Sequence, residues 1–400
     1  MIQQRFMKQN TILLLIVTFI KVNLLFGQEK ISFSFANAKN RKTTALTLKR
    51  EIDSLVYASS NPGKDENKWL KAFWAMELML YAPKEWEAKI PRFIEKLPGF
   101  NPEMQRAFLE MLYTLYPLTF GKELLQVWPM LENAKNQAMA LEYLANAQLF
   151  PEISSSHRIY HSGWHRAYQK RWFSAHCEYP GEDHFLHAEL LKEADILCSF
   201  QYSDRNIPGY LMIRKKNGTW LADQQGNPLK FMQLARSISN LPYYLTNGNT
   251  PQGLYRITGY DHSDNGWIGP TKNVQMVMPF ENDNSFFKGY NTGELTYKQL
   301  LMPVIEHFPS LWEVYEAGKL GRSEIIAHGT TINPTFYEKA PYFPCTPSLG
   351  CLCSPEKWNK RGQRTKSTQQ AWINTLEKER INPEWLIVVE IGRSRKIRSS

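Results

Sequence analysis

Apolar residues recur at helical spacing through residues 45–151, in units that each end in proline. Residues 71–83 (KAFWAMELMLYAP) and 106–117 (RAFLEMLYTLYP) share a basic-Ala-Phe start and a Met/Leu/Tyr interior, and 137–151 repeats the ending. The three final prolines follow one another at intervals of 34 residues, with room for a second helix in between. This pattern predicts a helical repeat domain over 28–155, built of helix pairs stacked as a short α-solenoid that serves either as a scaffold or as a partner-binding surface.

The periodicity changes after about residue 201. Residues 209–229 place Asn217-Gly218 between two strand-like runs, which is a strong hairpin signal because both turn residues need positive φ. Further strand-like runs, GLYRITGY and VQMVMPF, are separated by Gly, Pro and Asn. We therefore predict a β-rich domain over 201–392. Within this domain we expect a helical insertion at about 295–319 and a second helix at about 368–379.

The predicted fold is thus a two-domain α plus β chain, in which residues 156–200 form a histidine-rich connecting segment. Six of the nine histidines lie in that segment. His157, His161 and His165 are four residues apart, which on a helix would place them on one face, a spacing that can bind zinc. Their nearby aromatic and basic residues equally suit an ordinary domain interface. Additional ligands could come from Cys177, Asp183, His184 and His187.

The first 27 residues have the outline of a secretory signal peptide: Arg5, Lys8 and Lys21, no acid, and an apolar run from Thr11 to Ile20. An uncleaved membrane anchor is the alternative. Either predicts an exported protein of the periplasm or cell envelope. Removing this leader lowers the formal net charge from +10 by three, to +7, which leaves a mildly basic surface and a basic tail at 393–400. Because an exported chain seldom meets nucleic acid, we expect none as a partner and favour acidic envelope polymers or lipids.

Three of the five cysteines lie close together in the stretch CTPSLGCLC, at positions 345, 351 and 353. Their sulfurs could form a disulfide, such as Cys345 with Cys351. They could also bind a metal together with His328, which would complete a Cys3His ligand set. A third possibility is a nucleophile. A thiol with a pKa near ~8.5 is only partly ionised at neutral pH, so a nucleophilic cysteine needs a nearby base or cation.

Three separated pieces of the β-rich region carry a recognisable pattern: TPQGLYRI at 250–257, IIAHGTT at 325–331, and SLGC at 348–351. Together, in this order, they resemble the catalytic domain of the L,D-transpeptidases of the YkuD type, over about residues 200–390. The family usually has a histidine at the position of Leu349 and an arginine at the position of Cys353.

The resemblance implies that Cys351 is the nucleophile and His328 its base, with Gly329 and Gly350 shaping the site and no cofactor or metal. Cys351 would attack a tetrapeptide stem of peptidoglycan, form a thioester and pass the acyl group to an amine. With water as acceptor, the enzyme would be an L,D-carboxypeptidase. A second alternative is a non-catalytic envelope-binding protein, in which a degenerate transpeptidase domain binds stem peptides without reacting with them. The implied substrate-binding residues are Ser348, Thr330, Leu349, Tyr255 and Lys357.

The odd number of cysteines permits a pairing that leaves Cys351 free. We hypothesise disulfides between Cys345 and Cys353 and between Cys177 and Cys198. The peptidoglycan stem peptides are then the expected partners of the β-rich domain, and an envelope protein the expected partner of the helical repeats.

Overall fold

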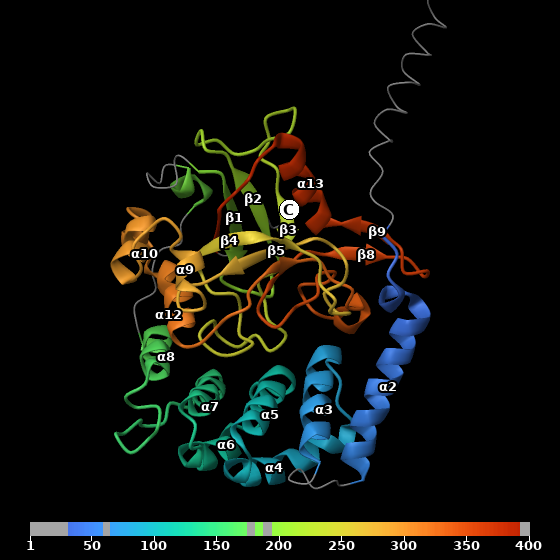
Figure 1. The fold of residues 1–400 in the computed structure, drawn as a ribbon. Coiled ribbons are helices and arrows are strands. Elements are labelled where there is room, and N and C mark those ends of the chain that lie inside the picture. The colour runs from blue at the N-terminus through green and yellow to red at the C-terminus, as the bar shows by residue number, and fades with distance from the viewer. Residues whose placement is uncertain (1–30, 59–64, 174–180, 187–193, 393–400) are drawn as a thin grey trace, which may run out of the picture.

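The computed structural model describes residues 31–58, 65–173, 181–186 and 194–392 (Figure 1). The leader predicted at 1–27, the basic tail and Cys177 lie outside these residues. In the described part of the chain, no helix combines the length and the apolar character needed to cross a membrane.

Helices make up the N-terminal half of the described chain, as the periodicity predicts. α3, α5 and α7 lie in successive contact, and α4 contacts α6 beside them (Figure 1). Asparagine side chains cap α2, α5 and α7 by accepting backbone N–H groups at their first turns. The helices are α2 (Ala38–Tyr57), α3 (Glu66–Met79), α4 (Ile90–Lys96), α5 (Pro102–Leu115), α6 (Gly121–Val127), α7 (Ala134–Asn146) and α8 (Gly163–Phe173).

An eight-stranded sheet forms the second half, in the order β3-β2-β1-β10-β4-β5-β6-β7. The β1–β10 and β6–β7 pairs are parallel and the others antiparallel. Leu234, next to β3, bridges Cys353 of β7 through two backbone hydrogen bonds, so the two edges of the sheet meet and the sheet is nearly barrel-shaped. The strands are β1 (Ile196–Tyr202), β2 (Gly209–Arg214), β3 (Phe231–Gln233), β4 (Gly253–Asp261), β5 (Asn273–Val277), β6 (Ala327–His328), β7 (Leu352–Cys353) and β10 (Trp385–Ile391).

Most local predictions in this half are confirmed. The Asn217-Gly218 turn follows β2, and the runs GLYRITGY and VQMVMPF contain β4 and β5. Of the two turn residues expected to have positive φ, only Gly218 does, at 78°. α13 (Thr368–Glu379) occupies the helix predicted at 368–379. The insertion is helical but broken into short pieces: α10 (Glu294–Leu300), α11 (Val304–His307) and α12 (Glu313–Lys319), preceded by α9 (Asp283–Phe286).

The predicted start of the sheet at residue 201 is wrong. β1 begins at Ile196 and lies between β2 and β10, where its residues are buried on both faces. A strand buried on both faces lacks the alternation that marks a half-exposed strand, and its sequence ILCSFQY gives no clear boundary.

The two halves share packing at their junction. One apolar core fills the helical region and continues into the loop around Tyr243 and Tyr244 and into residues 332–345, while a second core fills the sheet. Tyr244 donates to Glu142 of α7 at 2.5 Å, and Tyr337 donates to the carbonyl of Leu78 at 2.8 Å. Both segments, the loop around Tyr244 and residues 332–345, are therefore held by hydrogen bonds to the helical half.

A two-stranded hairpin, β8 (Glu356–Trp358) and β9 (Arg364–Ser367), extends from the sheet toward α2 (Figure 1). The backbone of residue 33 and of Ala38 bonds to this hairpin, which ties the start of the described chain to the second half.

Candidate active site

The three sequence pieces that carry the resemblance meet at one turn, residues 348–351. Thr250 of the first piece donates its hydroxyl to the carbonyl of Gly350 at 2.9 Å. His328 of the second lies opposite Cys353 in the parallel β6–β7 pair, which sets the turn at the entry to β7. Within the turn, Ser348 Oγ donates to the carbonyl of Cys351 at 2.9 Å and accepts the Gly350 N–H at 3.2 Å. The sheet thus joins segments that are about 100 residues apart in the sequence.

Cys351 is a partly exposed residue, and its sulfur has polar neighbours. Its Sγ lies 3.6 Å from the carbonyl of Glu324 and accepts the backbone N–H of Ile326. Burial raises the pKa of the Cys351 thiol, whereas the Ile326 N–H and the charge of Arg322 lower it, since both favour the thiolate. These two groups are the local stabilisers of an ionised sulfur.

The other described cysteines are buried free thiols. Burial raises the pKa of Cys198 and of Cys345 to about 12, and raises that of Cys353 further. The hypothesised Cys345–Cys353 disulfide is therefore wrong, as is the alternative Cys345–Cys351 bond. Cys198 is also unpaired, and its proposed partner Cys177 lies outside the described residues.

Arg322 is a cation beside Cys351 that sequence reasoning missed. It is 7% exposed, and its guanidinium donates to the carbonyls of Tyr243 at 2.6 Å, Leu245 at 2.9 Å and Gly248 at 3.2 Å. Burial lowers the pKa of Arg322 to about 10, which leaves it charged at neutral pH. The side chain therefore locks the loop 243–249 and places a positive charge beside Cys351.

Gly350 is required by this packing. Its φ is 114°, and a Cβ there would lie 2.5 Å from Arg322 Nη2 and 2.6 Å from the carbonyl oxygen of Gly248. A side chain would strain the backbone and displace the arginine. Its N–H is already donated to Ser348, whereas the N–H of Cys351 has no acceptor among the described residues.

His328 is 4% exposed and does not hydrogen-bond to Cys351 in the described structure. Its Nδ1 bonds to the carbonyl of Gly329, which can only accept, so Nδ1 carries the proton and Nε2 keeps its lone pair. Burial lowers the pKa of His328, so the ring is neutral. In the β6–β7 register, His328 lies opposite Cys353, two residues beyond Cys351.

Gly329 and Thr330 surround a buried carboxylate. A Cβ on Gly329 would lie 2.4 Å from the Glu356 carboxyl carbon, and the Thr330 N–H donates to Glu356 Oε2 at 3.1 Å. Thr271 donates to the other oxygen at 2.6 Å. Burial raises the pKa of Glu356. The sequence HGT thus folds tightly around Glu356, which holds the end of β6 against β8.

The five predicted substrate-binding residues divide into two groups. Ser348, Thr330 and Tyr255 are buried, and their hydroxyls bond to internal partners: the carbonyl of Cys351, the hydroxyl of Thr346 and the carbonyl of Pro251. The hydroxyls of these three residues therefore hold neighbouring segments of the protein in position, and they are not presented to a substrate in this structure. Leu349 is 48% exposed at the turn, and Lys357 is exposed on the β8–β9 hairpin.

The predicted histidine face does not form. α8 begins at Gly163, so only His165 of the three is helical; His157 accepts the Ser154 N–H and packs on Trp128, and His165 bonds to the carbonyl of Tyr160. Within the described ranges no three His, Cys, Asp or Glu residues are placed to share a metal ion, and these ranges include the suggested Cys3His set. These histidines are bound to local backbone and aromatic groups instead.

Sequence reasoning missed Arg322, Ile326 and Glu356 for different reasons. Ile326 acts through its backbone, which no side-chain pattern reports. Arg322 and Glu356 are single charged residues, and most of their partners lie far away in the chain: Arg322 bonds to carbonyls more than 70 residues away, and Glu356 bonds to Thr330 and Thr271. No local signal distinguishes them from surface residues.

Comparison with known proteins finds no match: no family model, no curated protein and no solved structure matches this chain. The resemblance to the L,D-transpeptidases depends on the three motifs and their positions alone.

Proposed function

We propose that the protein is an L,D-transpeptidase-like cysteine acyltransferase with Cys351 as nucleophile. The observation that carries this proposal is the convergence of the three motifs on a turn that holds the one described thiol that is not buried. That thiol lies beside a backbone N–H and a guanidinium, the two kinds of group that favour a thiolate.

The proposed chemistry uses the Cys351 thiol, the His328 imidazole and the Cys351 backbone N–H. The Cys351 thiol gives its proton to His328 Nε2, and the sulfur forms a bond to the acyl carbon while the carbon–nitrogen bond to the leaving amine breaks. His328 returns the proton to that amine. The Cys351 N–H is the oxyanion donor, because the Gly350 N–H is occupied by Ser348. An acceptor amine then gives its proton to His328 and forms the new carbon–nitrogen bond while the carbon–sulfur bond breaks, and His328 returns the proton to the Cys351 thiolate.

This mechanism requires a small local movement. His328 is paired with Cys353, two residues beyond Cys351, so the imidazole or the turn must shift before Nε2 reaches Sγ. Hydrogen bonds of catalytic pairs are often long before substrate binds. Substrate binding at Leu349, the exposed apolar residue of the turn, is the event we expect to bring them together.

The substrate proposal rests on the resemblance: a peptidoglycan stem tetrapeptide as acyl donor, in the periplasm or cell envelope. With water as acceptor the same thioester would give an L,D-carboxypeptidase. The separation of His328 from Cys351 favours a second candidate, an envelope-binding protein that holds stem peptides without reacting.

We also propose that the helical half is a short repeat array. In support, each of the three units carries one glutamate, Glu77, Glu110 or Glu142, which stands six, seven or nine residues before the final proline, and all three are buried. Glu110 accepts from Asn247 at 3.1 Å, and Glu142 from Tyr244, so two of the three bind the same loop of the sheet half. The array would then act as the support of the loop that Arg322 locks.

Intact-mass measurement after exposure to a carbapenem, and separately to a tetrapeptide muropeptide, tests the function. We expect one covalent adduct, lost in Cys351→Ala and kept in the matched variant Cys345→Ala, whose thiol is buried. His328→Gln should slow adduct formation by about 100-fold, since a general base contributes that order. An adduct that persists in Cys351→Ala excludes this nucleophile. Tight reversible binding of muropeptide without any adduct would establish the binding protein instead.

A further inference from the structure

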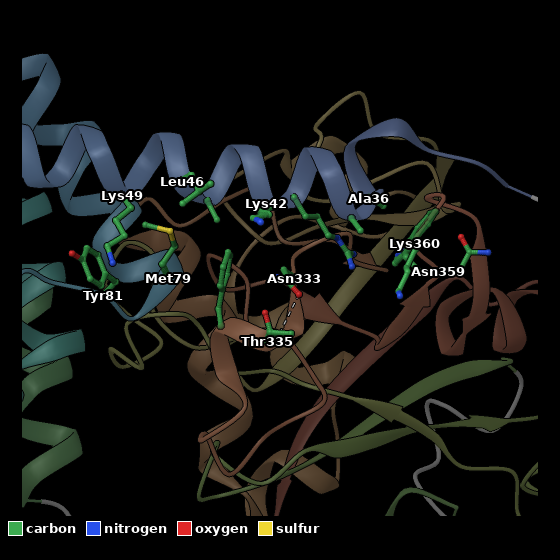
Figure 2. A pocket seen from close by; sticks show the side chains of 15 residues that line it. Ala36, Lys42, Leu46, Lys49, Met79, Tyr81, Asn333, Thr335, Asn359 and Lys360 are labelled. Carbon is green, nitrogen blue, oxygen red and sulfur yellow. Dashed lines mark hydrogen bonds between the residues drawn. The ribbon is translucent and has the colours of Figure 1, made fainter.

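A groove of about 540 Å³ lies between α2 and the segments 333–336 and 358–360 (Figure 2). Its volume falls in the range of about 300–1,000 Å³ that small-molecule sites occupy. Leu46 from α2, Met79 from the end of α3, and Phe336 and Trp358 from the sheet half provide apolar lining. None of its lining residues belongs to the candidate active site.

The charged side chains that line this groove have one sign; the carboxylate of Asp53, which accepts from the Tyr81 hydroxyl at 2.7 Å, is not among them. Arg41, Lys42, Lys49 and Lys360 line it, and no Asp or Glu does. Lys42 and Lys49 extend from α2, and Lys360 lies at the other end of the groove on the sheet side (Figure 2). Four cations without a carboxylate repel one another, so a bound anion would relieve this repulsion.

The four cations differ in how far the protein already uses them. Arg41 donates to the carbonyl of Thr331 at 2.6 Å, yet its Nε is buried without a partner in the described structure. Lys49 lies over the Tyr81 ring at 4.5 Å. Lys42 and Lys360 are exposed, and no hydrogen bond or ion pair of their amines is found among the described residues. Lys42 and Lys360 are therefore the amines available to a ligand.

We infer that this groove binds an amphiphilic anion, a molecule with one apolar chain that ends in a phosphate or carboxylate. The chain would lie on Leu46, Met79 and Phe336, and the head group between Lys42, Arg41 and Lys360. The apolar lining alone would bind any apolar molecule of suitable size, and the cations alone would bind any anion. Their combination in one groove selects a ligand that has both parts.

The chain's own ends do not suit this groove. Residues 1–27 carry three basic residues and no acid, and residues 393–400 carry four basic residues and no acidic side chain. Like charge disfavours either end as the occupant. A separate anionic ligand is therefore the occupant we propose.

Dodecyl phosphate and dodecanoate, each below its micelle concentration, are the probes that test this inference. Titration calorimetry and intrinsic tryptophan fluorescence should both show saturable binding at one site. Dodecanol and inorganic phosphate should bind at least about tenfold more weakly, because each lacks one half of the ligand. Preference between the two probes identifies the head group as phosphate or carboxylate.

Charge reversal provides the decisive comparison. Lys42→Glu with Lys360→Glu should weaken dodecyl phosphate binding by about tenfold or more, while the matched double variant Lys68→Glu with Lys378→Glu, at exposed positions elsewhere, should bind like the unaltered protein. Cys351→Ala should also bind normally, which separates this inference from the proposed catalysis. Equal affinity in both double variants, equal binding of dodecyltrimethylammonium, or no saturable binding would overturn the inference.

Discussion

Cys351 and Cys353 are two residues apart and lie in different chemical environments. Cys351 is partly exposed at a turn, beside the Arg322 guanidinium and the Ile326 N–H. Cys353 is 1% exposed in β7, where the carboxylate of Glu356 and the neighbouring Cys345 sulfur add to burial in raising its pKa. Position in the sequence therefore says little about thiol reactivity, because the groups that decide it come from distant segments.

The strongest way to break this comparison is thiol labelling of the native protein. Cys351 should react with a neutral alkylating reagent at least about 100-fold faster than Cys345 or Cys353, because reaction requires an accessible thiolate and the pKa of Cys345 is raised to about 12. Peptide mapping after timed labelling measures the rates. In denaturant the three should label alike, and comparable rates in the native protein would remove the distinction.

Replacing the cation beside Cys351 should have the next largest effect. Arg322→Met removes a charge that favours the thiolate and leaves three or more carbonyls without a donor. We expect about 3 kcal/mol less stability and labelling of Cys351 slowed about tenfold, with the rate–pH curve moved to higher pH. Arg361→Met, exposed on the hairpin, should change neither chemical denaturation nor labelling. An unmoved rate–pH curve would show that Arg322 has only a structural role.

Gly350→Ala examines the turn itself. The added Cβ would lie 2.5 Å from Arg322 Nη2, and the alanine would have to adopt a φ of 114°. We therefore expect a loss of about 2–3 kcal/mol in unfolding free energy. Gly226→Ala is the matched control: its φ is also positive, at 86°, but nothing lies within 4 Å of its Cβ. That control should cost only about 1 kcal/mol. Equal losses would mean that backbone strain alone explains the glycine.

Glu356→Gln should have the smallest effect, and it tests the buried carboxylate that lies near Cys353. Burial raises the folded-state pKa of Glu356, so its stabilising contribution is present below the unfolded pKa near 4.5 and is lost as pH rises through the folded value. The amide cannot ionise, so Tm of the variant should fall less than that of the parent between about pH 4.5 and neutrality. Parallel Tm–pH curves for the two proteins would contradict this assignment.

Local sequence signals were reliable where the contacts they report are local. The three helical units, the turn at Gly218 and the helix at 368–379 were all predicted from neighbouring residues, because helix periodicity and turn preferences act within a few positions. The prediction of a histidine face at 157–165 was wrong because the spacing of the histidines does not by itself make a helix, and α8 begins only at Gly163.

The site shows the same division. Sequence picked out Cys351, His328 and the glycines beside them, and the fold brings their segments together. Sequence did not give the roles of Ser348, Thr330 and Tyr255, whose hydroxyls the structure places on internal partners. A hydroxyl's partner depends on which strand lies opposite, and register is a long-range property.

By itself the sequence determined the order of helical and β-rich halves, the positions of most elements and the one turn where chemistry is expected. Tertiary structure decided which sulfur is accessible, which charge lies beside it and that Glu356 is buried under Gly329. The physical reason is range. Secondary structure follows from contacts a few residues apart, whereas the pKa and exposure of a side chain follow from burial and charge contributed by every segment packed around it.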